Sequence, residues 1–102
     1  MSKNRPSNHA VKQELFLKCG KVDMYNMKKY EGKKLVLHHD PPFRKTHHTI
    51  YEESYLLSEK NHIELHKYEL DNHDEYDRRM DIIKENKKIL EKSRVVNDTK
   101  QY

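Results

Sequence analysis

The stretch "SYLLSEKNHIELH", residues 54–66, joins two patterns that belong to different elements of structure. Residues 54–58 form a short apolar run of the kind that makes a strand. Ser58 then stands where a helix N-cap belongs, and Glu59 places an acidic side chain in the first turn. We therefore predict a strand over residues 54–58 that leads directly into a helix over residues 59–70.

The predicted helix carries two histidines, His62 and His66, which are four residues apart. At that spacing both side chains lie on one face of a helix, about one turn apart. This is the geometry with which two imidazoles can bind one metal ion, as paired ligands do in helical zinc sites. Taken alone, the pair is also consistent with two histidines exposed on the surface of a helix.

A second apolar stretch, "KKLVLHH" (residues 33–39), predicts another strand, which Pro41 ends. His38 and His39 close this strand, and strict alternation sends neighbouring side chains to opposite faces. The two imidazoles can serve one site only if the strand ends there, which Pro41 and Pro42 favour. One histidine could then bind metal while its neighbour stays free as a base. The alternative is a half-buried His38 and a solvent-facing His39 with no joint role.

Helices are predicted on both sides of these strands. Ser7 can cap a first helix that stops at Gly20, and residues 21–32 form a loop that could hold a short strand. Residues 74–93 form a long amphipathic helix, and residues 94–102 are expected to be a flexible tail. The apolar positions are Ala10, Val11, Leu15 and Phe16 in the first helix and Tyr76, Met80, Ile83 and Leu90 in the last.

The composition bounds the size of the core and the setting of the protein. Of 102 residues, 33% are hydrophobic and 37% charged, so we expect one domain (1–102) with a thin core. Domains of this size are marginal without a metal, disulfides or a partner. A single cysteine, Cys19, excludes an internal disulfide and is expected to be a buried or idle thiol. No apolar run reaches ten residues, so we expect no membrane partner and a cytoplasmic protein.

The two histidine motifs together resemble the HNH nucleases, the ββα-metal or His-Me finger superfamily. "HHDPP" and "HIELH" are similar in order and spacing to the motifs of the colicin-type bacterial DNases, and the resemblance covers residues 33–68. It implies an α+β fold with a small ββα-metal core, an N-terminal helix and a long C-terminal helix. The net charge of +4 is compatible with a nucleic-acid partner.

Carried over position by position, the resemblance implies that His39 is the general base. His38, His62 and His66 would hold one divalent metal ion, with Mg, Mn, Ni and Zn all open. Such an ion acts as a Lewis acid on a phosphate, and a histidine of ordinary pKa can take a proton from water near neutral pH. The implied activity is metal-dependent endonucleolytic hydrolysis of phosphodiester bonds, with DNA the favoured substrate and 5′-phosphate and 3′-hydroxyl ends as products.

One position departs from the family pattern. The central asparagine of the family lies near the start of the second strand, where this chain has Glu53, and Asn61 is too close to the helix to replace it. We include Glu53 in the catalytic set as its replacement. The substitution keeps a second hypothesis open, in which a catalytically weak or inactive HNH-fold module, such as a phage-encoded inhibitor, grips DNA or a host protein. A structural zinc domain is a third reading.

The polar connection over residues 43–53 supplies candidate contacts to nucleic acid. Arg44 and Lys45 are predicted to contact phosphate oxygens, which positions the backbone without selecting a sequence. The alternative is that they are ordinary solvated charges. His47 and His48 are expected to be exposed. The apolar stripe of the last helix must be buried against the first helix or against a second copy of the chain, so a homodimer through this helix is also a candidate partner.

Overall fold

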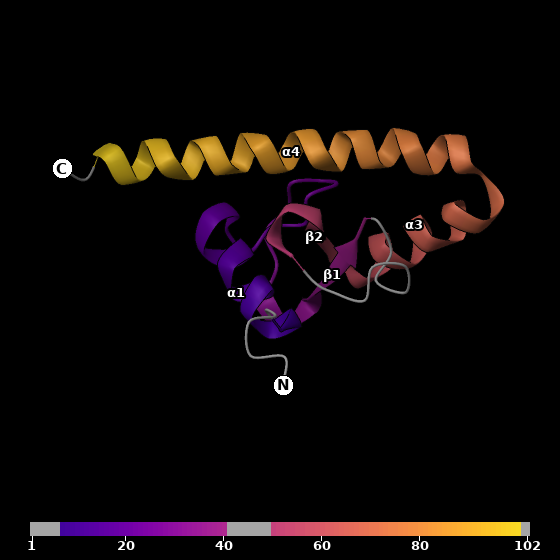
Figure 1. Ribbon diagram of the computed structural model, residues 1–102, viewed down its shortest axis with the longest axis horizontal. Helices are drawn as coiled ribbons and strands as arrows, with labels where there is room; N and C mark the ends of the chain where they lie inside the picture. Colours follow the sequence, from indigo (N-terminus) through magenta and orange to yellow (C-terminus); the bar gives the residue numbers. More distant parts are fainter. Residues whose placement is uncertain (1–6, 41–49, 101–102) are drawn as a thin grey trace.

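The elements follow the order expected from the sequence and confirm an α+β fold (Figure 1). The computed structural model describes residues 7–40 and 50–100, with side chains as far as residue 93. Within these residues, three α-helices pack around a two-stranded antiparallel sheet. The elements are α1 (Asn8–Cys19), η1 (Gly32–Lys34), β1 (Leu35–His39), η2 (Tyr51–Glu53), β2 (Ser54–Ser58), α3 (Glu59–Asp71) and α4 (His73–Lys100).

Local side-chain signals set the helix ends where the sequence predicts them. The Ser7 hydroxyl accepts the N–H of Ala10 at 3.0 Å at the start of α1, and Ser58 accepts the N–H of Asn61 at 3.4 Å at the start of α3. Gly20 follows α1 with a φ of 86°, in the left-handed region that favours glycine. The predicted start of α1, its end before Gly20 and the start of α3 are therefore confirmed.

The two strands pair in antiparallel register, with Leu35 opposite Ser58 and His39 opposite Ser54. β1 starts later than the predicted strand because η1 takes the first two residues of that stretch. Every residue of β2 is buried, whereas β1 is buried only at Leu35 and His38. The sheet is thus covered on both sides at β2, and β1 forms its more open edge.

The long helix α4 lies across the other elements, and the strands sit below its middle part (Figure 1). It contacts α1, α3 and β2, so its predicted apolar stripe is buried within a single chain. Tyr76, Met80 and Ile83 are buried in this contact, and Leu90 is partly buried. We expected the helix to end at residue 93, but α4 continues to Lys100.

The hydrophobic core is small, as the composition predicts. Its buried members come from α1, the following loop, both strands, α3 and α4. They are Val11, Leu15, Cys19, Met24, Leu35, Tyr55, Leu56, Leu57, Leu65, Tyr76, Met80 and Ile83. Cys19 is among them, which confirms the prediction of a buried thiol. Of the described helices, none has the length and the apolar character that a bilayer span requires.

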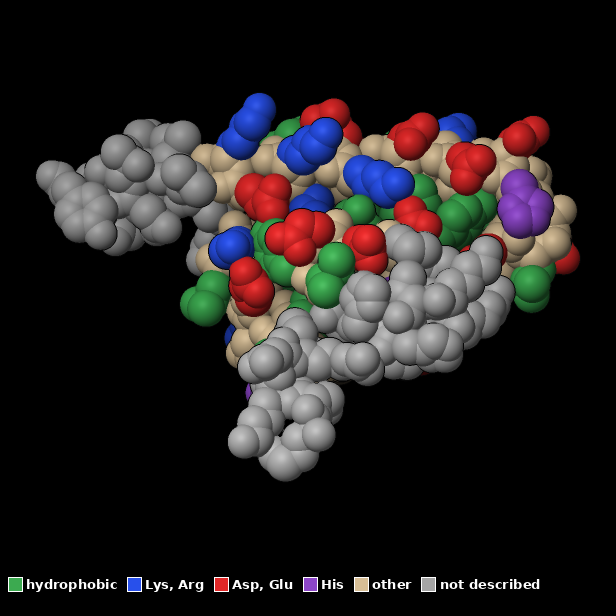
Figure 2. All heavy atoms as spheres, in the orientation of Figure 1, with side chains coloured by type: hydrophobic (Ala, Val, Ile, Leu, Met, Phe, Trp, Pro, Cys, Tyr) green, Lys and Arg blue, Asp and Glu red, His purple; other side chains and the backbone are tan. Residues whose placement is uncertain are grey.

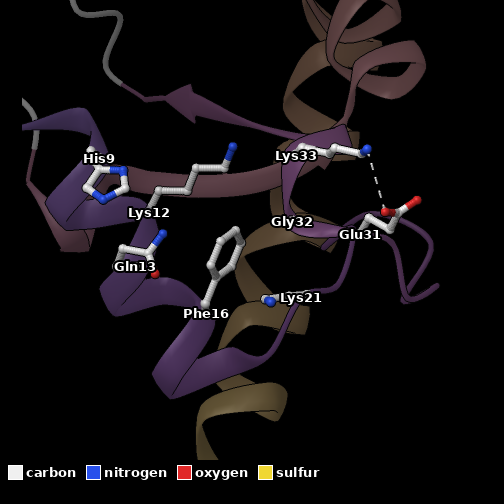
Figure 3. Close-up of a pocket in the computed structure, with 8 residues that line it drawn as sticks. All are labelled: His9, Lys12, Gln13, Phe16, Lys21, Glu31, Gly32 and Lys33. Atoms are coloured by element: carbon white, nitrogen blue, oxygen red, sulfur yellow. Dashed lines mark ion pairs between the residues drawn. The ribbon is translucent and has the colours of Figure 1, made fainter.

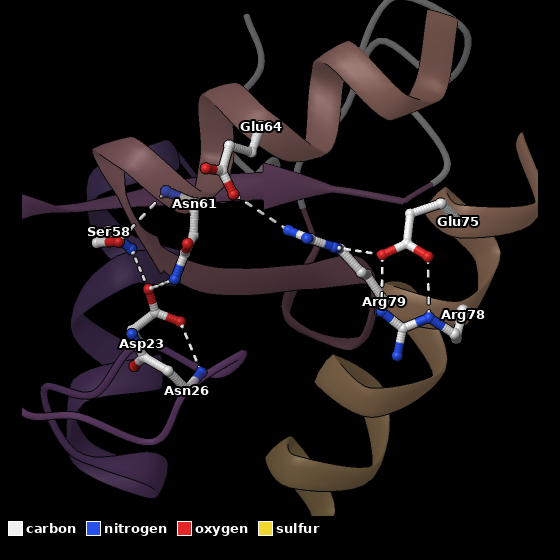
Figure 4. A network of polar contacts seen from close by, with 8 residues as sticks. All are labelled: Asp23, Asn26, Ser58, Asn61, Glu64, Glu75, Arg78 and Arg79. Carbon is white, nitrogen blue, oxygen red and sulfur yellow. Dashed lines mark hydrogen bonds and ion pairs between the residues drawn. The ribbon is translucent and has the colours of Figure 1, made fainter. Parts of the chain in front are cut away.

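A buried carboxylate fixes the loop after α1 to the junction of β2 and α3 (Figure 4). Asp23 is fully buried and accepts the main-chain N–H groups of Tyr25 at 2.7 Å and Asn26 at 3.2 Å. Its second oxygen accepts the N–H of Ser58 at 2.9 Å and the side-chain amide of Asn61 at 2.8 Å. Because four donors meet one carboxylate, the start of α3 is held in place from outside the helix.

A set of charged contacts joins α3 to α4 (Figure 4). The Arg79 guanidinium donates to Glu64 of α3 at 3.2 Å and to Glu75 of α4 at 2.8 Å. It also lies over the ring of Tyr68, 4.6 Å from the ring centre. These contacts hold the two helices side by side, since the arginine side chain is only 15% exposed and its geometry is constrained.

Replacing Asp23 with asparagine is expected to lower the free energy of unfolding by about 2–3 kcal/mol, because an amide nitrogen cannot accept the hydrogen bonds that one carboxylate oxygen now accepts. Urea unfolding followed by circular dichroism measures the change. The matched control is Asp71→Asn, an exposed carboxylate at the end of α3, which should change stability by less than about 0.5 kcal/mol. Equal stability of the two variants would mean that this network does not hold the loop.

Candidate metal centre

Three histidines from two elements converge at the end of the sheet. His38 is the fourth residue of β1 and is only 1% exposed, while His62 and His66 lie on one face of α3. α3 begins beside Leu35, at the other end of β1, and packs along β1, which brings His62 and His66 next to His38. One ligand atom from each histidine lies within 4.8 Å of the other two. This group could hold a metal ion.

The distances suit an ion of the zinc type. The Nε2 atoms of His62 and His66 are 3.0 Å apart. Zinc–nitrogen bonds of about 2.0–2.1 Å in a tetrahedral site place two ligand nitrogens roughly 3.3 Å apart. The ring of His38 lies 5.4 Å from that of His62 and 5.3 Å from that of His66, centre to centre. The two helical histidines are thus within a few tenths of an ångström of a ligating pair.

The buried imidazole of His38 provides an independent test of the fit. Its Nε2 lies 3.0 Å from the hydroxyl of Tyr76, but its Nδ1 is buried and has no hydrogen-bond partner among the described residues. Leaving such an atom unsatisfied costs about 1–3 kcal/mol. A metal ion at the histidine cluster would supply the missing partner, so the residues present fit a bound metal.

The electrostatics favour the neutral imidazoles that metal binding requires. Burial lowers the pKa of His38 to about 3, and the nearby charges of His62, His66 and His39 act in the same direction. Burial also lowers the pKa of His62 to about 4, with further contributions from His66 and His39. At neutral pH these rings are uncharged and keep a lone pair available for a cation.

His39 lies beside the cluster without belonging to it. It is the last residue of β1 and is half-buried, and burial lowers its pKa. Its charge contributes to the lowered pKa of both His38 and His62, which shows that it lies within electrostatic reach of the cluster. The next residue, Asp40, pairs with Lys84 of α4 at 3.1 Å. The strand end that carries His39 is therefore fixed to α4.

Glu53 meets the same strand end through its main chain. Its carbonyl accepts the N–H of Asp40 at 3.0 Å, one residue beyond His39. Its carboxylate forms no hydrogen bond or ion pair with any residue that the structure describes. The structure therefore brings the backbone of Glu53 to the segment of the predicted base, and the proposed role of its carboxylate stays a prediction.

Other predicted site residues fall outside the described part of the chain. Arg44 and Lys45 lie between residues 40 and 50, as do His47 and His48. Their predicted contacts with phosphate, or their exposure, therefore stay predictions. Pro42 lies in the same gap, and the described part of β1 ends at His39 before it.

Two contacts of the cluster were not predicted from the sequence. Tyr76 was expected only as a core residue of the last helix, and its hydroxyl meets His38 from 38 positions away. The predicted site also lacks Glu69, whose carboxylate lies 3.1 Å from Nδ1 of His66. The i, i+3 spacing of His66 and Glu69 on one helix was a usable sequence signal. No local pattern pointed to the Tyr76 contact.

A separate pocket of about 500 Å³ lies between α1 and η1 (Figure 3). Lys12 and Lys21 hold their amines 5.8 and 5.5 Å from the centre of the Phe16 ring, and Lys33 lines the far side. Since η1 precedes β1, this pocket lies at the opposite end of the strand from His38. On the face drawn in Figure 2, basic and acidic side chains are interspersed along α4.

Comparisons with known proteins do not assign this centre a role. No family model matches the chain, and searches of the curated proteins and of the solved structures found no match either. The resemblance of the two histidine motifs therefore remains an expectation from the sequence, and the function is inferred from the residues that the fold brings together.

The double variant His62→Ala with His66→Ala is expected to abolish stoichiometric metal binding. A ligand present at 100 times its dissociation constant stabilises the folded state by about 2.7 kcal/mol, so zinc should raise the melting temperature of the wild type only. Metal content by mass spectrometry and thermal unfolding with and without chelator measure the effect. The control is His9→Ala with His73→Ala, both exposed and outside the cluster. Unchanged metal content in the first variant would contradict the ligand assignment.

Proposed function

We propose that this chain is a metal-dependent endonuclease that hydrolyses phosphodiester bonds of nucleic acid, with DNA as the favoured substrate. The observation that carries the proposal is the convergence of the ligand atoms of His38, His62 and His66 within 4.8 Å, with His39 next in the chain. Three clustered imidazoles with a fourth histidine beside them would supply both a cation site and a proton acceptor. These are the two components that hydrolysis of a phosphodiester requires.

The succession of elements supports the proposal. The chain runs from β1, which ends in His38 and His39, to β2 and then directly into α3, which carries the other two histidines. This is the order that the resemblance to HNH nucleases implies for a ββα-metal core. A protein that only needed a structural metal would have no evident use for a second histidine next to the buried ligand.

The proposed chemistry divides between the histidines. A divalent ion in the cluster would neutralise charge on the scissile phosphate and on the leaving oxygen. His39 would take the proton of the attacking water, which requires a neutral imidazole at the working pH. The lowered pKa of His39 is consistent with that state. The main-chain bond from Asp40 to Glu53 and the ion pair of Asp40 with Lys84 would limit movement of this base.

Substrate binding is assigned to cationic side chains near the strand end. Arg44 and Lys45 are proposed to contact phosphate oxygens on either side of the scissile bond. Lys84 is 45% exposed and pairs with Asp40, the residue that follows His39 in the chain. Phosphate contacts of this kind make binding sensitive to salt and independent of sequence.

A second candidate function is a binding module that keeps the metal but has weak or no catalysis. The observation in its favour is Glu53, which stands where the related nucleases have asparagine and whose carboxylate pairs with no described residue. Such a module would grip DNA or a host protein, as a phage-encoded inhibitor would. A second copy of the chain, packed along α4, is a further candidate partner, because Ile89 of that helix is 48% exposed.

A nicking assay tests the proposal directly. Supercoiled plasmid incubated with the purified protein and Mg²⁺, Mn²⁺, Ni²⁺ or Zn²⁺ should be nicked, and a chelator should stop the reaction. His39→Ala should lower the rate at least about 100-fold, because general-base catalysis contributes that much. The variant should retain its metal, since His39 is not among the three ligands.

The matched control is His73→Ala, an exposed histidine outside the cluster, which should cut like the wild type. Nicking by His39→Ala at the wild-type rate would contradict the assigned base. Protein that binds one metal ion yet cuts neither single- nor double-stranded DNA or RNA would contradict the nuclease and favour the binding module.

A further inference from the structure

The imidazole of His38 has two chemically different nitrogens in a place that solvent does not reach. The residue is 1% exposed, its Nε2 lies 3.0 Å from the Tyr76 hydroxyl, and its Nδ1 has no partner among the described residues. A neutral imidazole carries one hydrogen, on one nitrogen or the other. Which nitrogen carries it decides which one can bind a cation.

The groups around His38 favour one of its two neutral tautomers over the other. With the hydrogen on Nε2, the ring donates to the oxygen of Tyr76 and leaves a lone pair on Nδ1. With the hydrogen on Nδ1, a buried N–H would face no acceptor among the described residues, and the ring could not bind an ion through that atom. Only the first tautomer lets both nitrogens be satisfied when a cation is bound.

His66 shows the same arrangement with the nitrogens exchanged. Its Nδ1 lies 3.1 Å from a carboxylate oxygen of Glu69, one turn further along α3. A carboxylate accepts hydrogen bonds, so it selects the tautomer with the hydrogen on Nδ1. The lone pair of Nε2 is then directed at His62, whose Nε2 is 3.0 Å away. The Glu69 side chain is 16% exposed, so its contact is partly protected from water.

We propose that Tyr76 and Glu69 are positioning residues of the metal site, an inference that rests on the proposed function. Tyr76 accepts the Nε2 hydrogen of His38 and so assigns Nδ1 to the ion. Glu69 accepts the Nδ1 hydrogen of His66 and so assigns Nε2 to the ion. The site therefore uses one Nδ1 and two Nε2 atoms, and α4 takes part in it through Tyr76.

The environment of Tyr76 is consistent with this role. The residue is 7% exposed, and burial, followed by the charge of Asp40, raises the pKa of its hydroxyl. The phenol stays protonated and acts as a neutral acceptor, which leaves the charge of the site to the metal and its ligands. Partners of this kind fix the orientation and tautomer of ligating histidines in metal sites generally.

Zinc affinity tests the proposal, measured by competition with a chromophoric chelator. Tyr76→Phe removes one oxygen and should weaken zinc binding about 10- to 100-fold, the usual effect of losing such a partner. Glu69→Ala should do the same, and Glu69→Gln, which keeps an acceptor, should recover part of the loss. The controls are Tyr68→Phe and Glu59→Gln on α3, which should bind zinc like the wild type.

Nitrogen NMR of histidine-labelled, metal-free protein gives a second measurement that does not depend on affinity. His38 should carry its hydrogen on Nε2 in the wild type, and this preference should be lost in Tyr76→Phe. Wild-type zinc affinity in Tyr76→Phe and Glu69→Ala, or a ligand bond from Nε2 of His38 in the cadmium-substituted protein, would overturn the inference and leave the metal site intact. A wild-type protein that binds none of Mg²⁺, Mn²⁺, Ni²⁺ and Zn²⁺ would overturn both this inference and the proposed function.

Discussion

The fold places the polar imidazole of His38 inside a small hydrophobic core. His38 is almost fully covered, so each of its ring nitrogens needs a partner from the protein or from an ion. α4 satisfies one nitrogen with the hydroxyl of Tyr76, and α3 brings two further histidines toward the same place. The core around it is thin, with 33% hydrophobic residues in the chain, so a metal that joins β1 to α3 would add stability where apolar burial is limited.

α4 does more than cover the sheet, because it satisfies polar groups at the strand ends. Lys87 is 6% exposed and donates to the carbonyls of Tyr51 at 2.6 Å and Ser54 at 3.0 Å. Burial lowers the pKa of its amine, which is the cost of placing a cation there. Together with the ion pair of Lys84 and Asp40, this contact fixes both strand ends to one helix. The end of β1, which carries His39, is therefore held in place by side chains of α4.

Structural features that depend on residues close together in the sequence could be predicted. Contacts between residues far apart in the sequence could not. Ser58 as a helix cap and the shared face of the two α3 histidines follow from local spacing, and both are confirmed. The contact of Tyr76 with His38 joins positions 38 residues apart. The apolar stripe of the last helix predicts that the Tyr76 ring is buried, but it does not predict a partner for the hydroxyl. Asp23 was missed for the same reason, because its donors at the start of α3 lie 35 residues or more away.

The alternation of side chains along β1 places the two adjacent histidines in different environments. His38 is the buried member of the histidine cluster, whereas His39 follows it at the strand end and is only partly buried. Within the cluster, burial decreases from His38 to His62 and to His66, whose side chain is 48% exposed. Solvent thus reaches the cluster from the side of α3 and not through the core. If the three histidines held a four-coordinate ion, one position would remain for an outside oxygen, and the exposed His66 would leave that position open to solvent.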